Sequence, residues 1–456
     1  MKYPKYREYK DSNHKWIKDI PGNWEIKKLK LCLSRIESGN REIGGGNQLE
    51  NGVFSIGGEH IDWEGNINLN NPKYISEFFY SNLNSGKVME SDVLLVKDGA
   101  TIGKVAYVQE LSNRQIAINE HVFLLRANNL LYPKFLYYFL YSKIGQTQIE
   151  LNVRGAAQGG LNSSFIQRLY ITIPPIDVQK SISLFLDNEV DRLSKLINKQ
   201  IHMIELIKEK RQAIITNVVT KGLDPSVPMK DSGIEWIGKI PEPWTTMKIK
   251  HTSYVKGRVG WKGLTSEEYQ EDGYAYLVTG QDFQSKRIRW DSCYCVDKFR
   301  YEDDPYIQLK NGDLLITKDG TIGKLALVNG LEKPACLNSG IFLVRPYDYY
   351  ITDFLYYVLS SSVFSGFYLL RSFGSTIQHL YQNIFVDFSF PIPPRDEQGQ
   401  MVSYLEKQTS KIDKIISMEE RMIQLLKEYK ISLITQAVTG KIDVRGFAAS
   451  TTSNYT

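Results

Sequence analysis

Two long stretches of the chain carry a helical pattern of hydrophobic residues. Residues 177–220 and 396–439 contain no glycine or proline apart from Gly399. Their apolar residues recur at alternating spacings of four and three, which is typical of a heptad repeat. At about 1.5 Å per residue, each stretch would form a helix of ~65 Å. The pattern therefore predicts two long helices that pair as a coiled coil.

A second apolar stripe lies beside the heptad seam of each predicted helix. The seam includes Leu193, Ile197, Ile204, Ile207, Arg211 and Ile214 in the first helix, and Ile412, Ile416, Glu419, Ile423, Leu426 and Leu433 in the second. The further stripe comprises Ile182, Phe185, Leu196, Leu206, Ile215 and Val219, each matched by an apolar residue 219 positions later. One partner helix cannot cover both stripes. The second stripe therefore packs on the protein's own β-rich domains or docks other subunits, and both interpretations can hold at different ends.

The residue pattern in the rest of the chain is typical of β-strands joined by turns. Short runs rich in Val, Ile, Tyr and Phe are punctuated by Gly, Asn and Asp, as hairpins require. We expect β-rich domains at 1–175 and 236–392, long helices at 176–221 and 393–440, a linker at 222–235 and a C-terminal tail at 441–456, of which 447–456 is weakly structured.

The sequence contains a long internal repeat. The segment DVLLVKDGATIGKVAYV at 92–108 returns as DLLITKDGTIGKLALV at 313–328, and the Pro-Pro and Gln residues that open the first helix return at the second. The spacing stays at 219 to 221 residues, so one unit of roughly 215 residues is duplicated. Duplication of a unit predicts an internal pseudo-two-fold arrangement.

Composition and charge narrow the protein class. The net charge is +5, from 56 Lys and Arg against 51 Asp and Glu, which is compatible with nucleic-acid binding but does not establish it. No run reaches about 18 apolar residues, and the first residues lack the apolar core of a signal peptide. Four cysteines cannot build a disulfide framework. We therefore expect a cytoplasmic protein.

Two segments are similar to motifs of catalytic sites, but each lacks a residue that the motif requires. The loop from Gly99 to Lys104 has three residues between its glycines and lacks the Ser or Thr that holds magnesium in a phosphate-binding loop. The tetrad Asn71-Pro72-Lys73-Tyr74 has lysine where an adenine methyltransferase has a second proline. We expect no catalytic residue and no metal site, which disfavours a stand-alone methyltransferase or nuclease.

The order of the repeated motifs resembles one family. Three motifs appear twice between Lys10 and Asp443: Trp-Ile-x-x-Ile-Pro-x-x-Trp, Lys-Asp-Gly followed after two residues or one by Ile-Gly-Lys, and Pro-Pro-x-x-x-Gln before a long helix. This set resembles the specificity subunit of type I restriction–modification systems. A fourth motif of the family is Gly-Asp-(Ile/Leu)-Leu, and one departure from it is Ser91, which replaces the glycine that Gly312 keeps in the second copy.

The resemblance implies an α+β fold with two β-rich target-recognition domains separated by an antiparallel coiled coil. It implies that each domain reads half of a split DNA sequence, and that the helices carry two methyltransferase subunits, which restriction subunits can join. S-adenosylmethionine, ATP and magnesium would belong to those partners. Because the loops of the two β-rich domains differ, we expect an asymmetric target. Two alternatives are a coiled-coil adaptor with protein-binding β heads and the specificity subunit of a related type II assembly.

Loops with cations, glycines and polar side chains are the candidates for DNA contact. Candidates after the first long strand of each domain are Ser38, Asn40 and Arg41, followed by Gly44 to Gly46, and Lys256, Arg258, Trp261 and Lys262. Candidates after the next strand, for base reading, are Glu59, His60, Gln281 and Asp282. Arg154 and Arg371, each just before a glycine loop, are candidates for phosphate contact. A solvated glycine loop is the alternative for the first group.

The polar seam residues predict a register for the helix pair. A pseudo-two-fold axis requires antiparallel helices. One register places Arg211 against Glu419 and Gln200 against Lys430. A slip of one heptad would place Arg211 against Ile412 and desolvate an unpaired charge. We therefore predict the register with Arg211 opposite Glu419.

Overall fold

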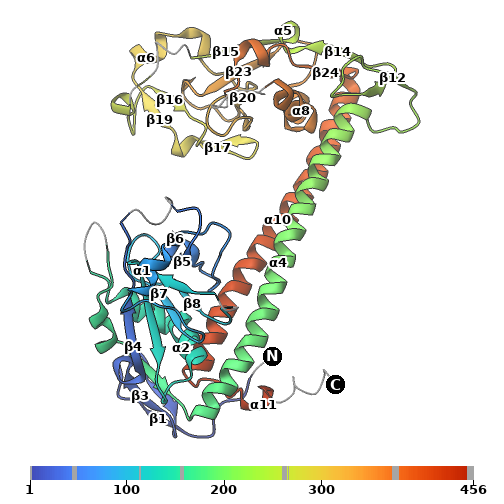
Figure 1. Ribbon diagram of the computed structural model, residues 1–456. Coiled ribbons are helices and arrows are strands. Elements are labelled where there is room, and N and C mark those ends of the chain that lie inside the picture. Colours follow the sequence, from blue (N-terminus) through green and yellow to red (C-terminus); the bar gives the residue numbers. More distant parts are fainter. Residues whose placement is uncertain are drawn as a thin grey trace. The chain divides into compact units, whose positions relative to one another are not determined.

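The computed structural model describes residues 3–43, 49–111, 114–154, 159–258, 264, 266–371 and 379–448. The chain forms two compact units, each with one β-rich domain and one end of both long helices (Figure 1). Unit 1 comprises residues 1–201 and 421–456, and unit 2 comprises residues 202–420. Within the described part of the chain, no helix has the length and hydropathy needed to cross a bilayer.

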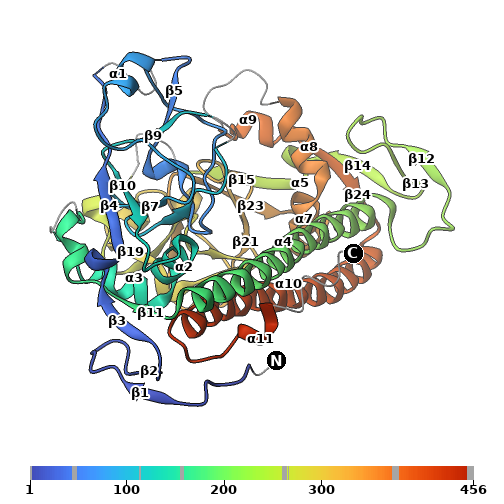
Figure 2. The same cartoon turned by 60° about the horizontal axis from the view of Figure 1, so that its bottom comes forward.

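The two long helices are α4 (Ile176–Lys221) and α10 (Arg395–Val438). Unit 1 holds the beginning of α4 with the end of α10, and unit 2 holds the end of α4 with the beginning of α10. In each unit the two helix segments lie side by side (Figures 1 and 2). The helices are therefore antiparallel. All of the predicted seam residues are buried or half-buried.

The repeated Pro-Pro-x-x-x-Gln motif attaches each helix to its β-rich domain. The side chain of Gln179 is fully buried. Its oxygen accepts from Tyr132 N at 2.7 Å, and its Nε2 donates to the carbonyls of Leu130 and Pro174. Gln398 repeats this arrangement with the backbone of Ile351, Tyr349 and Pro393. The glutamine thus satisfies buried backbone groups at the junction between domain and helix.

The β-rich domain of unit 1 contains a four-stranded antiparallel sheet in the order β4-β10-β7-β8 and a three-stranded sheet in the order β6-β5-β9. The strands are β1 (Tyr9–Asp11), β2 (Asp19–Pro21), β3 (Glu25–Lys28), β4 (Leu33–Ser38), β5 (Val53–Ile56), β6 (Tyr74–Ile75), β7 (Val93–Val96), β8 (Val105–Tyr107), β9 (Ile116–Ile118), β10 (Val122–Ala127) and β11 (Tyr170–Ile173). The helices are α1 (Glu77–Ser81), α2 (Pro133–Tyr141) and α3 (Lys143–Glu150). Strands β1 and β2 pair, as do β3 and β11.

The domain of unit 2 repeats this topology, with sheets β15-β23-β20-β21 and β19-β16-β22 and the pairs β12-β13, β14-β24 and β17-β18. Its strands are β12 (Met229–Asp231), β13 (Lys239–Pro241), β14 (Thr245–Lys248), β15 (Ser253–Gly257), β16 (Ala275–Val278), β17 (Phe283–Gln284), β18 (Arg287–Ile288), β19 (Tyr294–Val296), β20 (Leu314–Thr317), β21 (Leu325–Leu327), β22 (Ala335–Leu337), β23 (Ile341–Pro346) and β24 (Ser389–Ile392). Its helices are α5 (Ile249–Thr252), α6 (Lys298–Glu302), α7 (Thr352–Ser360), α8 (Ser362–Arg371) and α9 (Gln382–Phe385).

The turn before β7 keeps its shape without glycine. Ser91 has φ +70° where Gly312, before β20, has φ +91°. Both turns lead into a buried aspartate, Asp92 or Asp313, which binds an arginine of the neighbouring strand. The serine therefore pays a conformational cost of about 1 kcal/mol for the same turn.

Residues 441–448, the first part of the predicted C-terminal tail, are packed on unit 1. Ile442 and Val444 are buried in its core, and the Asp443 N–H donates to Pro4 O at 2.7 Å. The short helix α11 (Arg445–Ala448) brings Phe447 against Tyr3, with ring centroids 5.2 Å apart. Apolar residues within 441–448 therefore complete the core beside the segment that leads into β1.

The predicted register of the helix pair is wrong. Arg211 Nε lies 2.8 Å from the carboxylate of Asp413, six residues before Glu419. Asp413 adjoins Ile412, so this is the register that we rejected on the ground of an unpaired charge. The penalty does not arise because Arg211 remains 27% exposed and finds a carboxylate beside the apolar seam.

Candidate nucleic-acid interface

The loops at one end of each four-stranded sheet are joined by matching backbone hydrogen bonds. In unit 1, Asn119 N donates to Ile56 O, Lys97 N to His121 O, and Leu161 N to Lys97 O, at 2.7–2.9 Å. In unit 2 the corresponding bonds run from Asn338 N to Val278 O, from Lys318 N to Gly340 O, and from Leu380 N to Lys318 O, at 2.9–3.0 Å. We call these loop clusters polar edge 1 and polar edge 2. Edge 1 comprises 38–41, 57–60, 97–104, 119–121, 154 and 159–160, and edge 2 comprises 256–258, 279–282, 317–324, 338–340 and 379–380.

Close backbone packing explains one glycine of polar edge 1. A Cβ on Gly39 would lie 1.9 Å from the carbonyl oxygen of Ile118. The loop after β4 can therefore pass over the turn between β9 and β10 because residue 39 has no side chain. This passage brings Asn40 and Arg41 to the surface of the edge.

Several predicted DNA-contact residues are exposed on the polar edges or next to them. Arg41 is 81% exposed and lies 3.6 Å from Glu120. The carboxylate of Glu59 lies 2.5 Å from Lys73 Nζ, and Lys256 Nζ lies 5.9 Å from the ring centroid of Tyr306. Asn40, Arg154, Gln281 and Arg371, the last at the end of α8, are exposed, and Ser38 is half-buried at the end of β4.

His60 and Asp282 do not fit their predicted role as base readers. His60 is 3% exposed, its Nδ1 accepts from Gly57 N at 2.8 Å, and its Nε2 contacts Asn71 O. Asp282, at the equivalent position, is also buried and accepts from Thr279 N at 2.7 Å. Both side chains close the same turn from inside, and this leaves Glu59 and Gln281 as the exposed members of each pair.

Arg258 likewise does not fit its predicted role as a DNA contact. It is 3% exposed, and its Nε donates to Leu337 O at 2.9 Å. Its guanidinium also contacts Cys336 Sγ. A buried guanidinium with internal partners is unavailable to DNA. The other predicted members of this loop, Trp261 and Lys262, and the glycines 44–46 of unit 1 lie outside the described residues.

Sequence reasoning missed two histidines on the polar edges. His121 Nδ1 lies 2.5 Å from Asp98 Oδ1 on edge 1, and His379 Nδ1 contacts Asp319 Oδ1 on edge 2. Both aspartates belong to the repeated Lys-Asp-Gly turn, which was the signal that could have drawn attention to their partners. The turn's lysines, Lys97 and Lys318, each lie over a phenylalanine ring, at 5.2 and 5.5 Å.

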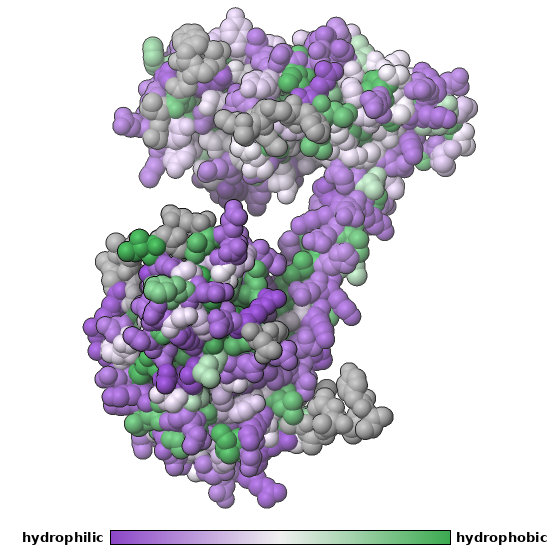
Figure 3. Space-filling view, viewed as in Figure 1, coloured by the Kyte–Doolittle hydropathy of each residue, from purple (hydrophilic) through white to green (hydrophobic). Residues whose placement is uncertain are grey.

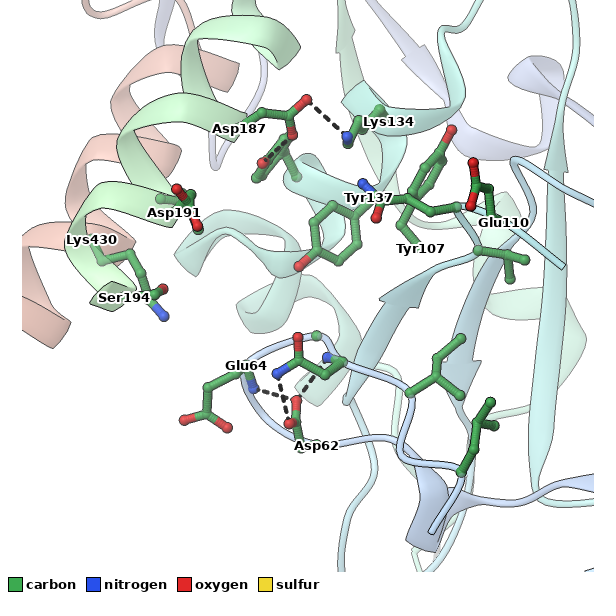
Figure 4. A pocket seen from close by; sticks show the side chains of 18 of the residues that line it. Asp62, Glu64, Tyr107, Glu110, Lys134, Tyr137, Asp187, Asp191, Ser194 and Lys430 are labelled. Atoms are coloured by element: carbon green, nitrogen blue, oxygen red, sulfur yellow. Dashed lines mark hydrogen bonds and ion pairs between the residues drawn. The ribbon is translucent and has the colours of Figure 1, made fainter. Parts of the chain in front are cut away.

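A separate cavity of about 1010 Å³ in unit 1 lies between the β-rich domain and the helices (Figure 4). On its helical side, Asp187 accepts from Tyr138 Oη at 2.7 Å and pairs with Lys134 at 2.8 Å. Lys430 also lines the cavity, and burial lowers the pKa of its ammonium group. The polar edge and this junction are thus different surfaces of the unit. At the junction, the ion pair and the hydrogen bond of Asp187 link the domain to α4.

The predicted second apolar stripe is divided between two environments. Near the helix ends, Ile182, Ile215, Val219, Met401, Ile434 and Val438 are buried on the β-rich domains. In the central parts, the stripe residues Leu196, Leu206, Ile415 and Leu425 are exposed, as are Met418 and Met422, which the predicted stripe did not include. The space-filling view shows such hydrophobic residues among hydrophilic ones along the helices (Figure 3). The packing interpretation of the stripe is therefore confirmed near the helix ends, and the docking of other subunits on the exposed central parts stays a prediction.

Comparisons with known proteins agree with this architecture. The family described as the type I restriction modification DNA specificity domain matches residues 22–206 and 241–428. The MjaVIII type I restriction enzyme specificity subunit of Methanocaldococcus jannaschii is 22% identical over 445 residues, covering 96% of this chain and 97% of the relative. The EcoKI specificity subunit of Escherichia coli is 23% identical over 211 residues, covering 45% of this chain and 44% of the relative.

Solved structures share the fold. A chain from a structure titled for the assembly and conformational transition of the type I restriction–modification system aligns with a TM-score of 0.70 at 16% identity, covering 92% of this chain and 98% of that one. The HsdS subunit from Thermoanaerobacter tengcongensis aligns with a TM-score of 0.50 at 17% identity, covering 93% and 98%. Because the family match spans both repeats and most of the chain, this protein belongs to the type I restriction–modification DNA specificity family.

Proposed function

We propose that the chain is the specificity subunit of a type I restriction–modification enzyme, in which each polar edge reads one half of an asymmetric, bipartite DNA target. The observation that carries the proposal is that one backbone framework holds different side chains in the two units. Glu59 in unit 1 corresponds to Gln281 in unit 2, and Glu120 corresponds to Ser339. Base edges are discriminated by such donors and acceptors, so different edges select different half-sites.

The exposed apolar residues in the central parts of α4 and α10 are the proposed docking surface for two methyltransferase subunits. Met422 and Leu425 are 46% and 44% exposed although they lie on a long, regular helix. Apolar surface of this kind is typical of protein interfaces. On this proposal the subunit is non-catalytic and cytoplasmic. Catalysis, S-adenosylmethionine, ATP and magnesium belong to the methyltransferase and restriction subunits.

Methylome sequencing tests the DNA-reading proposal. Cells that express the chain with its methyltransferase subunits should carry one split motif whose two halves differ. Gln281→Ala should relax or change one half of the motif, and Glu59→Ala should relax or change the other. Glu25→Gln, on strand β3 away from the polar edges, is the matched control and should leave the motif unchanged. A continuous or palindromic motif would refute the proposal.

Co-purification tests the docking surface. Leu425→Glu should abolish capture of the methyltransferase subunits, because burying a carboxylate in an apolar interface costs several kcal/mol. Lys427→Glu changes the charge by two units, against one for Leu425→Glu, at a position two residues away, and it is the control for charge alone. If the Leu425 variant captures as much methyltransferase as the wild type, the subunits bind at a different surface and the proposed docking surface is wrong.

A further inference from the structure

The repeated Lys-Asp-Gly turn holds a histidine ring in both units. Asp98 Oδ1 lies 2.5 Å from His121 Nδ1, and Asp319 Oδ1 contacts His379 Nδ1. The histidine side chains are 49% and 40% exposed. Each aspartate therefore binds one ring nitrogen while part of the ring stays at the surface of a polar edge.

The two histidines occupy different positions of the repeat. Lys97 N donates to His121 O, whereas Lys318 N donates to Gly340 O, so Gly340 stands where unit 1 has His121. The N–H of Leu161 and the N–H of Leu380 donate to the carbonyls of these same lysines. His379 therefore stands where unit 1 has Gly160. Histidine and glycine have exchanged places between the units.

Both glycine positions face the aspartate. A Cβ on Gly160 would lie 4.0 Å from Asp98 Cβ, and a Cβ on Gly340 would lie 3.8 Å from Asp319 Cβ. A histidine at either position can thus reach the carboxylate. Glycine at the other position leaves room for the ring that is present.

A shared loop-fastening role does not explain the exchange. His121 belongs to the short turn between β9 and β10, whereas His379 belongs to the segment that precedes α9. The two histidines would therefore hold different segments of the chain against the Lys-Asp-Gly turn. What the units share is an imidazole fixed by the same aspartate at the same place on the polar edge.

We propose that His121 and His379 are equivalent contacts to the DNA phosphate backbone. This inference rests on the proposed function and deepens it. Two domains that read different bases both contact the same kind of phosphate backbone. A histidine–aspartate pair that both polar edges share, although their other side chains differ, is therefore suited to a phosphate contact. His121 Nδ1 hydrogen-bonds Asp98 and His379 Nδ1 lies in ion-pair contact with Asp319. An imidazolium in either place would have its Nε2–H left to donate to a phosphate oxygen.

The two contacts differ in one neighbour. In unit 1, Glu120 Oε1 lies 3.5 Å from His121 Nε2 and 3.6 Å from Arg41 Nη1, so the phosphate has to displace a carboxylate. In unit 2 the corresponding residue is Ser339, which carries no charge. Removing His379 should therefore weaken DNA binding more than removing His121.

The test uses the full chain in complex with its methyltransferase subunits and a duplex of random sequence, over a series of salt concentrations. His379→Ala should weaken binding about tenfold, and should reduce the slope of log affinity against log salt by about 0.9, the value for one phosphate contact. The double variant with His121→Ala should reduce the slope by about twice as much. The matched control is His251→Ala, which changes an exposed histidine in α5, directly before β15 begins.

An exchange variant separates this role from a general loss of folding. His379→Gly combined with Gly340→His rebuilds in unit 2 the arrangement of unit 1, and it should recover most of the affinity and slope lost in His379→Gly alone. Failure of recovery in a variant that melts like the wild type overturns the inference. A changed methylation motif with unchanged salt slope also overturns it, because the ring would then read bases. If the wild-type complex does not bind duplex DNA, the proposed function itself fails.

Discussion

Lys430 in unit 1 and Arg211 in unit 2 occupy the same position of the repeat, yet the two units accommodate the cation differently. Arg211 pairs with Asp413 and stays partly exposed. Lys430 is 6% exposed, lies over the ring of Tyr141 at 6.0 Å, and has no hydrogen bond from Nζ to any described residue. The difference shows that the β-rich domain packed beside the helices, as much as the opposite helix, decides the environment of a polar seam residue.

Other parts of the two units are the same in detail. Asp92 accepts two hydrogen bonds from Arg126 at 2.7 Å, and Asp313 accepts two from Arg345 at 2.6 and 2.8 Å. Both carboxylates also accept a backbone N–H, from Met89 and Lys310. The duplication therefore kept the centre of each β-rich domain while the helix seam and the polar edges changed.

The largest expected effect comes from these shared aspartates. Asp92→Ala and Asp313→Ala should each lower the free energy of unfolding of their own unit by about 3 kcal/mol, because an arginine and a backbone N–H lose their partner. Denaturant unfolding with a probe in each unit measures this. The double variant Asp92→Ala, Arg126→Met should be more stable than Asp92→Ala alone. A loss below about 1 kcal/mol in one unit only would show that the two aspartates do not contribute equally to stability.

The equivalent turn residues His60 and Asp282 offer a second comparison. His60→Ala should destabilise unit 1 by about 2 kcal/mol, because the Gly57 N–H and the Asn71 carbonyl lose their partner. His60→Asp should recover part of that stability by accepting from Gly57 N, as Asp282 accepts from Thr279 N. If His60→Asp is as unstable as His60→Ala, the two turns are not closed in the same way.

Lys430→Met should stabilise unit 1 by about 1 kcal/mol, because methionine fills the site without a buried charge. Burial lowers the Lys430 pKa from 10.5, so the unfolded chain holds this proton more tightly than the native protein does. The penalty is therefore complete at pH values below the native pKa and is relieved as the pH rises toward 10.5. The advantage of the methionine variant should shrink over the same range. An advantage that does not vary with pH would indicate packing alone.

The smallest effect is expected for the exposed pair of unit 2. The coupling energy between Arg211 and Asp413 in a double-mutant cycle with Arg211→Met and Asp413→Asn should be about 0.5 kcal/mol and should fall in high salt. A coupling above about 2 kcal/mol would mean that this pair sets the helix register.

The parts of the fold that depend on local pattern could be predicted from sequence. Glycine-free heptads predicted the two long helices, and the motif spacing predicted the duplicated domains. The helix register could not be predicted, because the choice depended on whether Arg211 keeps solvent and on the position of Asp413, which lies outside the apolar seam.

Site residues were harder because exposure is a tertiary property. The polar residues after β5 and β16 were recognised, but their sequence does not say which member of Glu59-His60 or Gln281-Asp282 turns inward. Arg258 looked like a surface cation, whereas β22 supplies the carbonyl that binds it inside. The His121–Asp98 and His379–Asp319 pairs join residues 23 and 60 positions apart, which no local motif reveals.

The meeting of residues 3–11 with residues 439–448 in unit 1 has a consequence for protein engineering. Strands β1 and β2 copy β12 and β13, but in unit 2 the peptide 222–228 leads directly from α4 into this hairpin. In unit 1 the corresponding path is formed by two separate segments, residues 3–11 and residues 439–448. The Asp443 N–H donates to the carbonyl of Pro4, and the Tyr9 hydroxyl donates to the carbonyl of Gly440. A circular permutant that joins these segments by a short peptide and opens at 222–228 would thus preserve both hairpins. We expect such a permutant to exchange the order of the two β-rich domains along the chain without changing the structure of either domain.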